Sequence, residues 1–121
     1  GGITSALDWY KKGITASFEF NGLSASSYLA QPTLDFTTNA DARAKIATQE
    51  WIALFGQGFE SWTEWRRNQI PVLAPAAESL LDQVPSRLFY PTTEPSLNKA
   101  SYDAAVQTLG VDNLTAPLFW Q

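Results

Sequence analysis

The sequence contains no cysteine and no histidine among its 121 residues. The absence of cysteine excludes thiolate nucleophiles and cysteine-based zinc sites. The absence of histidine excludes the commonest general base, the Ser-His-Asp triad and most catalytic metal sites. Any catalytic site in this chain must therefore rest on carboxylates, lysine, tyrosine or serine. We expect no enzyme activity, no metal site and no cofactor.

Basic residues are scarce as well. Eight Lys and Arg stand against twelve Asp and Glu, which gives a formal net charge of -4. Nucleic-acid-binding proteins usually present a basic face, and the only adjacent basic pairs are Lys11-Lys12 and Arg66-Arg67. The sequence therefore predicts no nucleic-acid partner. No run approaches the ~20 apolar residues that span a bilayer, and no signal-peptide pattern opens the chain.

The remaining composition, 45% hydrophobic and 17% charged, is that of one globular domain. Apolar residues recur at helical spacing from about Ser5, the expected N-cap, to Phe20, and the Asn21-Gly22 pair is a typical helix stop. This helix has two apolar faces, the second of which contains Trp9. We therefore expect it to be covered from two sides.

Aromatic residues are concentrated in the segment WIALFGQGFESWTEWRRN, residues 51–68. A helix is expected from Asn39 or Asp41 up to the Gly56-Gln57-Gly58 break, and helical spacing then resumes as far as Asn68. The pattern predicts a helix–turn–helix hairpin. Its tryptophans share a helical period with leucine and phenylalanine, which is more typical of a core than of a ligand platform.

Proline punctuates residues 70–97 and excludes a long helix there. A short helix is expected near 76–81, and the best strand candidate is RLFYP, residues 87–91, with Val72-Leu73 as its partner. Asn98 is expected to cap a final helix that ends at Leu109. The chain thus divides into a helical part (1–69), a Pro-rich wrap (70–97) and a final helix with an extended tail (98–121).

Two groups of charged residues are candidates for chemistry. Glu60 and Glu64 lie one helical turn apart, so they could form an acid/base pair. Neighbours on one helix do not easily straddle a sugar, and ion pairs with Arg66, Arg67 or Lys45 are the simpler interpretation. The two arginines are favoured as structural groups near helix-terminal carbonyls, and Glu94 as a group that holds a loop through backbone amides.

Three stretches, residues 46–73, 84–98 and 117–120, resemble the C-terminal part of the SusD/RagB family. The residues of the motif, to which we assign a structural role, are Trp51, Gly58, Glu60, Trp62, Trp65, Arg66, Arg67, Arg87, Tyr90, Pro91, Glu94 and Asn98. The sequence departs from the family pattern at Glu50, where lysine is usual, and at Asn68-Gln69, which replaces Thr-Gly. Neither change conflicts with the fold that the resemblance implies.

The resemblance implies a mainly α fold of tetratricopeptide-like helical hairpins, with a Pro-rich irregular segment that contains at most a short β-hairpin. Family members are longer lipoproteins, anchored by a lipidated cysteine on the surface of the outer membrane. They bind glycans or other nutrients without catalysis and act with a TonB-dependent transporter. Their sugar-binding aromatics lie mainly upstream, so no ligand-contact residue is assigned here, and the core is expected to be shared with the remainder of a parent protein.

Two alternatives stay open at this point. The first is an autonomous helical protein–protein interaction module, which requires an exposed Trp62 or Trp65. The second and weaker one is a glycoside hydrolase that uses Glu60 and Glu64.

Overall fold

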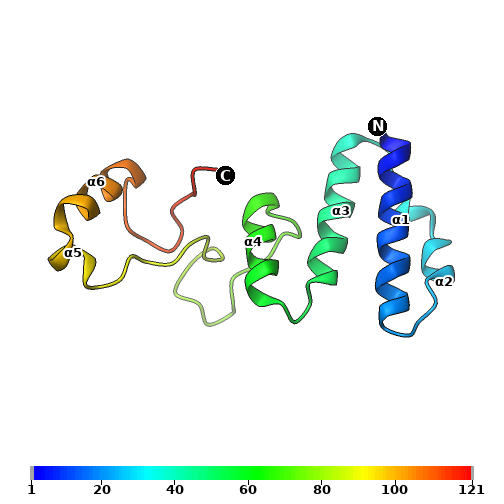
Figure 1. The fold of residues 1–121 in the computed structure, drawn as a ribbon, viewed down its shortest axis with the longest axis horizontal. Helices are drawn as coiled ribbons and strands as arrows, with labels where there is room; N and C mark the ends of the chain where they lie inside the picture. Colours follow the sequence, from blue (N-terminus) through cyan, green and yellow to red (C-terminus); the bar gives the residue numbers. More distant parts are fainter. Residues whose placement is uncertain (1, 121) are drawn as a thin grey trace. The chain divides into compact units, whose positions relative to one another are not determined.

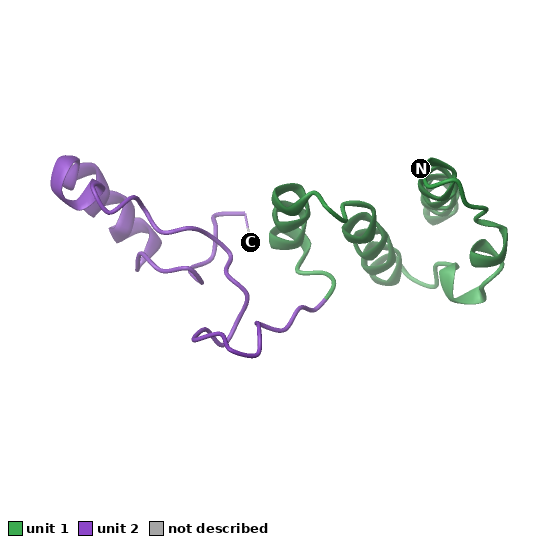
Figure 2. Cartoon of the chain, turned by 90° about the horizontal axis from the view of Figure 1, so that it is seen from below, with its two compact units in different colours: residues 1–71 green, residues 72–121 purple. Residues whose placement is uncertain are grey.

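The computed structural model describes residues 2–120, and over these residues it contains helices and no strand (Figure 1). The predicted mainly α fold is confirmed. The chain divides into two compact units, residues 1–71 and 72–121 (Figure 2). In chain order the helices are α1 (Ile3–Phe20), α2 (Ser26–Leu29), the 3-10 helix η1 (Pro32–Leu34), α3 (Asn39–Ala53), α4 (Gly58–Asn68), α5 (Glu94–Leu97) and α6 (Lys99–Leu109).

In the first unit, α1 supplies the buried core. It begins at Ile3 after Gly2, with no side-chain cap, so the predicted start at Ser5 is two residues late. It ends as predicted at Phe20, where Gly22 adopts a positive φ of 70°. Such a φ suits glycine because glycine has no Cβ to clash.

The core combines aromatic and aliphatic residues of α1 with residues that follow it. Tyr10, Ile14, Ala25 and Leu34 are buried, and Leu7, Phe18, Tyr28, Leu29 and Phe36 pack against them.

Helix α3 begins at Asn39, one of the two predicted positions, but its cap is the preceding residue. The Oγ1 of Thr38 accepts a hydrogen bond from the Asp41 backbone N–H at 3.1 Å. The Asp41 carboxylate accepts from the Thr37 backbone N–H at 2.9 Å and from Lys45 Nζ at 2.9 Å. These bonds favour the ionised form and lower the pKa of Asp41, with the Thr37 backbone bond as the largest cause.

Asp41→Asn is therefore expected to lower the melting temperature at neutral pH. A lowered pKa in the folded state contributes stability above the unfolded pKa, and this contribution is lost as the pH falls through the folded pKa. The gap between wild type and variant should close as the pH falls below the ordinary carboxyl value of 3.8. Thermal melts at neutral and acidic pH measure this, with Asp8→Asn, an exposed site on α1, as the charge control. Equal melting temperatures at neutral pH would contradict it.

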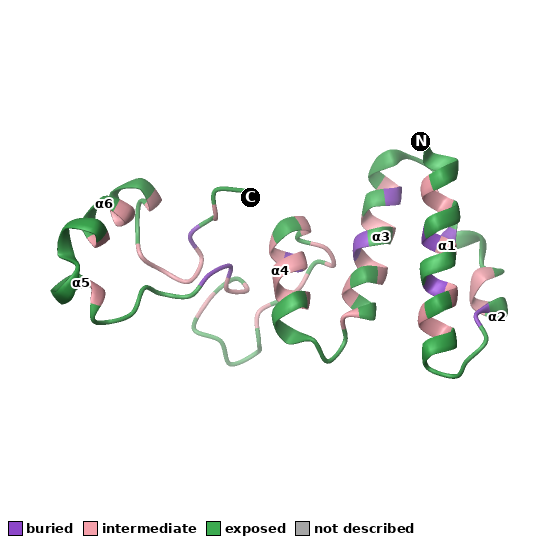
Figure 3. Cartoon of the chain, in the orientation of Figure 1, coloured by how far each residue is buried: buried purple, intermediate pink, exposed green. Residues whose placement is uncertain are grey.

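The predicted hairpin of α3 and α4 is confirmed. Helix α3 ends at Ala53 and α4 begins at Gly58, and Gly56 between them has a φ of 86°. Within the first unit α3 packs against both α1 and α4. Few residues along these helices are buried, and much of the cartoon in Figure 3 has the colour of exposed residues. Over the described residues, none of the helices combines the length and the hydrophobicity that a membrane span requires.

The second unit departs more from the sequence-based expectations. The expected strand at 87–91 is absent, because the backbone N–H groups of Ser86 and Arg87 donate to the carbonyl of Leu114 instead of to residues 72–73. The expected helix at 76–81 is only a turn, in which the Ser79 N–H donates to the carbonyl of Ala76. Helix α6 ends at Leu109 as predicted.

Asn98 occupies the N-cap position of α6, but its side chain makes no capping hydrogen bond. Its Nδ2 instead donates to Glu94 Oε2 at 3.1 Å. The expected role of Glu94, which was to accept from backbone amides, is thus replaced by this side-chain pair. Because the Asn98 side chain is engaged one turn back along the chain, it is not aimed at the first amides of α6.

Candidate functional site

The aromatic segment on α3 and α4 contains one buried tryptophan. Trp65 is only 8% exposed, and its Nε1 donates to the carbonyl of Pro71 at 3.0 Å. Trp51 and Trp62 are half-buried. Phe55 and Phe59 are 94% and 78% exposed. The prediction of a tryptophan core therefore holds for Trp65, whereas the two phenylalanines that share its period are not covered by this chain.

The charged residues of α4 are engaged with one another and with the aromatics. The guanidinium of Arg66 lies 4.0 Å from the ring centroid of Trp62, and its Nη2 is 3.3 Å from Thr63 Oγ1. Arg67 forms an ion pair with Glu64 at 3.5 Å. This arrangement supports the structural interpretation of both arginines. An interaction module that requires an exposed Trp62 or Trp65 finds little support, since Trp65 is buried and Arg66 lies over Trp62.

Glu60 and Glu64 do not form the geometry of a glycosidase. Both project from α4, one turn apart, and together with Glu50 they line one shallow hollow. Carboxyl groups of a glycosidase flank the scissile bond from two sides. Lys45 takes no part, because its ammonium pairs with Asp41. In the described part of the chain, no three His, Cys, Asp or Glu side chains lie close enough together to hold a metal ion.

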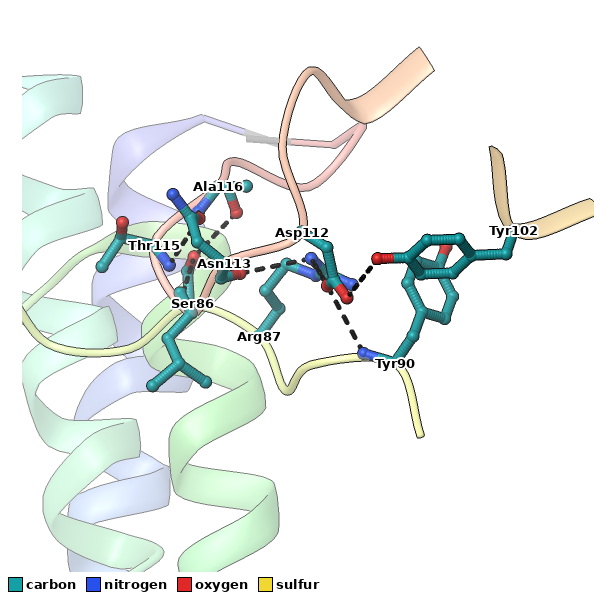
Figure 4. Close-up of polar contacts among 9 residues, drawn as sticks. Ser86, Arg87, Tyr90, Tyr102, Asp112, Asn113, Thr115 and Ala116 are labelled. Atoms are coloured by element: carbon teal, nitrogen blue, oxygen red, sulfur yellow. Dashed lines mark hydrogen bonds and ion pairs between the residues drawn. The ribbon is translucent and has the colours of Figure 1, made fainter. Parts of the chain in front are cut away.

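The second unit contains a buried ion pair that sequence analysis missed (Figure 4). Arg87 Nη1 donates to Asp112 Oδ1 at 2.8 Å, and the two side chains are 9% and 14% exposed. Arg87 also donates to the carbonyl of Asn113 at 3.2 Å. The Oγ of Ser86 donates to the carbonyl of Ala116 at 2.9 Å. These contacts tie the loop around residue 87 to the loop at 112–116.

Aromatic residues surround the same pair. Asp112 Oδ2 accepts from the Tyr102 hydroxyl at 3.4 Å, and Asp112 Oδ1 lies 3.4 Å from the Tyr90 backbone N–H. The rings of Tyr90 and Tyr102 meet edge to face at 5.7 Å, and the Arg87 guanidinium lies 5.0 Å from the Tyr90 centroid. Partial burial, followed by the nearby Asp112 carboxylate, raises the pKa of Tyr102. The cluster thus contains a neutral phenol and a paired charge. This arrangement is suited to holding two loops together and does not provide a nucleophile with its base.

Of the motif residues in this part of the chain, the structure brings Arg87 and Tyr90 together and pairs Glu94 with Asn98. The partners that complete the cluster, Ser86, Asp112 and Asn113, were not predicted. The available signal was Arg87 itself, because an arginine in an apolar loop requires a carboxylate or carbonyls. It did not identify which carboxylate, since the partner lies 25 residues away.

A groove of about 430 Å³ lies between α1 and α3 in the first unit. Its walls include Ala6, Trp9 and Gly13 from α1, and Ile46, Glu50 and Ala53 from α3. Gln49, which also lines the groove, donates from Nε2 to the Tyr28 hydroxyl at 2.6 Å. Burial raises the pKa of the Tyr10 phenol, which also lines the groove. The lining of the groove is therefore largely apolar, apart from the Glu50 carboxylate.

The sequence and the fold of this chain are similar to those of known proteins. Residues 2–91 match the family model for SusD-like proteins, described as starch-binding and associating with the outer membrane. A solved SusD-like protein from Bacteroidetes is 29% identical, with a TM-score of 0.81, and the alignment covers 93% of this chain and 25% of that one. A solved chitin-binding protein is 31% identical, with a TM-score of 0.74, over 93% of this chain and 27% of that one. No curated protein matches the sequence. The chain thus spans about a quarter of the length of these solved relatives.

Proposed function

The chain belongs to the SusD-like family, and on that premise we propose that it is part of a non-enzymatic lipoprotein that binds glycans at the outer membrane. The family match over residues 2–91 carries the proposal. The likeness to a chitin-binding protein at 31% identity supports a glycan as the ligand class. The proposed partner is a TonB-dependent transporter that imports the captured nutrient, and the lipid anchor belongs to the parent protein outside this cysteine-free chain.

The share of this chain in that function is chiefly structural. Supporting this, Trp65 is buried, Arg66 and Arg67 are engaged within α4, and Arg87 is paired with Asp112. The exposed Phe55 and Phe59 support a further point, namely that the remainder of the parent protein packs against the turn between α3 and α4. The principal glycan site then lies mainly outside these 121 residues.

The absence of catalysis is proposed from what the carboxylates do. Glu64 is paired with Arg67, and Glu60 projects from the same helix one turn away. Two acids so placed reach a sugar from one side only, whereas glycoside hydrolysis needs an acid and a nucleophile or base on either side of the bond.

The test is a panel of starch-type and chitin-type glycans presented to the full-length lipoprotein and to this chain. We expect saturable binding by the full-length protein, much weaker binding by the chain, and no release of reducing ends. The Glu60→Gln/Glu64→Gln double variant should bind as the wild type does. Failure of the full-length protein to bind any glycan or other nutrient would contradict the proposal, and so would reducing-end release that the double variant abolishes.

A further inference from the structure

The end of α1 contains a chemically labile pair, Asn21-Gly22. Asn21 is the only asparagine in the sequence that is followed by glycine. Asparagine is among the thermally labile residues of proteins, because the backbone nitrogen of the next residue can attack its side-chain carbonyl carbon. Glycine has no Cβ to hinder that attack. Asn21 is therefore the asparagine of this chain that is most prone to lose its side-chain amide.

The structure holds this pair in the cap that ends α1. The Gly22 backbone N–H donates to the Glu19 carbonyl at 2.9 Å, and the Leu23 backbone N–H donates to the Phe18 carbonyl at 2.9 Å. These two bonds form a Schellman motif, in which the residues after the helix satisfy its last carbonyls. The nitrogen that would attack Asn21 is thus engaged, through its own N–H, in the closed cap.

The side chain of Asn21 is engaged as well. Its Nδ2 donates to the Ser17 carbonyl at 2.8 Å, so the side-chain amide is held back along α1. The reaction requires the Gly22 nitrogen to lose its proton and to meet the side-chain carbonyl carbon of Asn21. Both hydrogen bonds oppose these steps, and both break when the cap opens. Helix ends open locally at a smaller cost than global unfolding, so the labile pair is exposed to reaction during such openings.

We propose that Asn21 is a site of spontaneous deamidation and that opening of the α1 cap sets the rate. Hydroxide removes the proton of the Gly22 nitrogen, which then forms a bond to Asn21 Cγ. The bond from Cγ to Nδ2 breaks, and Nδ2 takes a proton from water and leaves as ammonia. Water then opens the resulting succinimide. Opening at Cγ gives aspartate, and opening at the main-chain carbonyl carbon gives isoaspartate. This inference does not depend on the proposed function.

Both products weaken the cap from which they form. A carboxylate only accepts hydrogen bonds, so the Ser17 carbonyl loses its side-chain donor. The new negative charge lies at the C-terminal end of α1, where the helix dipole disfavours it. Isoaspartate also adds one carbon atom to the main chain before Gly22, which alters the spacing of the Schellman bonds. Because Phe18 of the last turn packs against the core, deamidation loosens the end of the helix that supplies this core.

The experiment is an incubation of the full-length protein at mildly alkaline pH, followed by trypsin digestion and mass spectrometry. The fragment 13–43 contains both Asn21 and Asn39, and Asn39, which Ala40 follows, is the internal comparison. We expect aspartate and isoaspartate at Asn21 while Asn39 stays intact. A synthetic peptide of residues 17–26 is too short for a stable helix and should react at least about tenfold faster, since its nitrogen is not held in a cap. No excess of product at Asn21 over Asn39 would overturn the site, and equal rates in protein and peptide would overturn the role of the cap.

Two phenylalanines of the last turn provide matched variants. Phe18→Ala removes a side chain that packs against the core, whereas Phe20→Ala removes one that is 90% exposed. We expect Phe18→Ala to raise the rate toward that of the peptide and Phe20→Ala to keep the wild-type rate. Equal rates in the two variants would overturn the proposal. Asn21→Gln should abolish the modification of this fragment, because a glutamine ring closes far more slowly, and unchanged product in that variant would place the reaction elsewhere.

Discussion

Trp65→Ala is expected to lower the free energy of unfolding of the first unit by about 3–5 kcal/mol. The side chain is buried at 8% exposure, and its Nε1 donates to the Pro71 carbonyl at 3.0 Å. The substitution removes a large apolar surface from the α4 side of the unit and leaves that carbonyl without its indole donor. Urea denaturation followed by far-UV circular dichroism measures the change.

Two further variants serve as controls for this result. Trp65→Phe keeps most of the apolar contact but loses the hydrogen bond, so its cost should be about 1–3 kcal/mol. Trp9→Ala removes the exposed tryptophan of α1 and should change stability by only about 0.5 kcal/mol. If Trp65→Ala were as mild as Trp9→Ala, the structural role assigned to the α4 motif would be wrong.

Asp112→Ala is expected to destabilise the second unit by about 3–5 kcal/mol, because it leaves the buried Arg87 guanidinium without its carboxylate. The pair is short, at 2.8 Å, and both side chains are largely shielded from water. The readout is hydrogen exchange of the Ser86 and Arg87 amides, which donate to the Leu114 carbonyl. Their protection should fall strongly in the variant.

An exposed pair on α6 is the matched comparison. Lys99 and Asp103 are 72% and 54% exposed, so Asp103→Ala should cost no more than about 1 kcal/mol. A double variant, Arg87→Met with Asp112→Leu, removes both buried charges and should recover much of the lost protection. Unchanged exchange in Asp112→Ala would show that the pair does not hold the two loops together.

Local signals in the sequence predicted the helices well. Helix α1 ends at Asn21-Gly22 and the α3–α4 turn contains Gly56 because these residues adopt conformations that a continuing helix does not. Helix α3 begins at Asn39, one of the two predicted positions, whereas its cap, Thr38, was not predicted. Thr38, Asn39 and Asp41 all have cap-forming side chains, and only the backbone angles decide that Thr38 takes the role.

Long-range pairing explains what the sequence did not predict. The segment 87–91 has the composition of a strand, but the Arg87 backbone N–H donates to the Leu114 carbonyl and the Arg87 side chain pairs with Asp112, more than 20 residues away. No periodicity encodes such a partner. In the same way, helical spacing identified Phe59 and Trp65 as one apolar set without showing that only Trp65 is covered within the chain.

Glycan capture by the full-length lipoprotein is tested by calorimetry of its equilibrium binding to starch-type and chitin-type oligosaccharides. We expect saturable heat with at least one glycan, recovery of the sugar intact afterwards, and a much weaker signal from this chain by itself. No binding to any glycan, or recovery of shortened sugar, would contradict it.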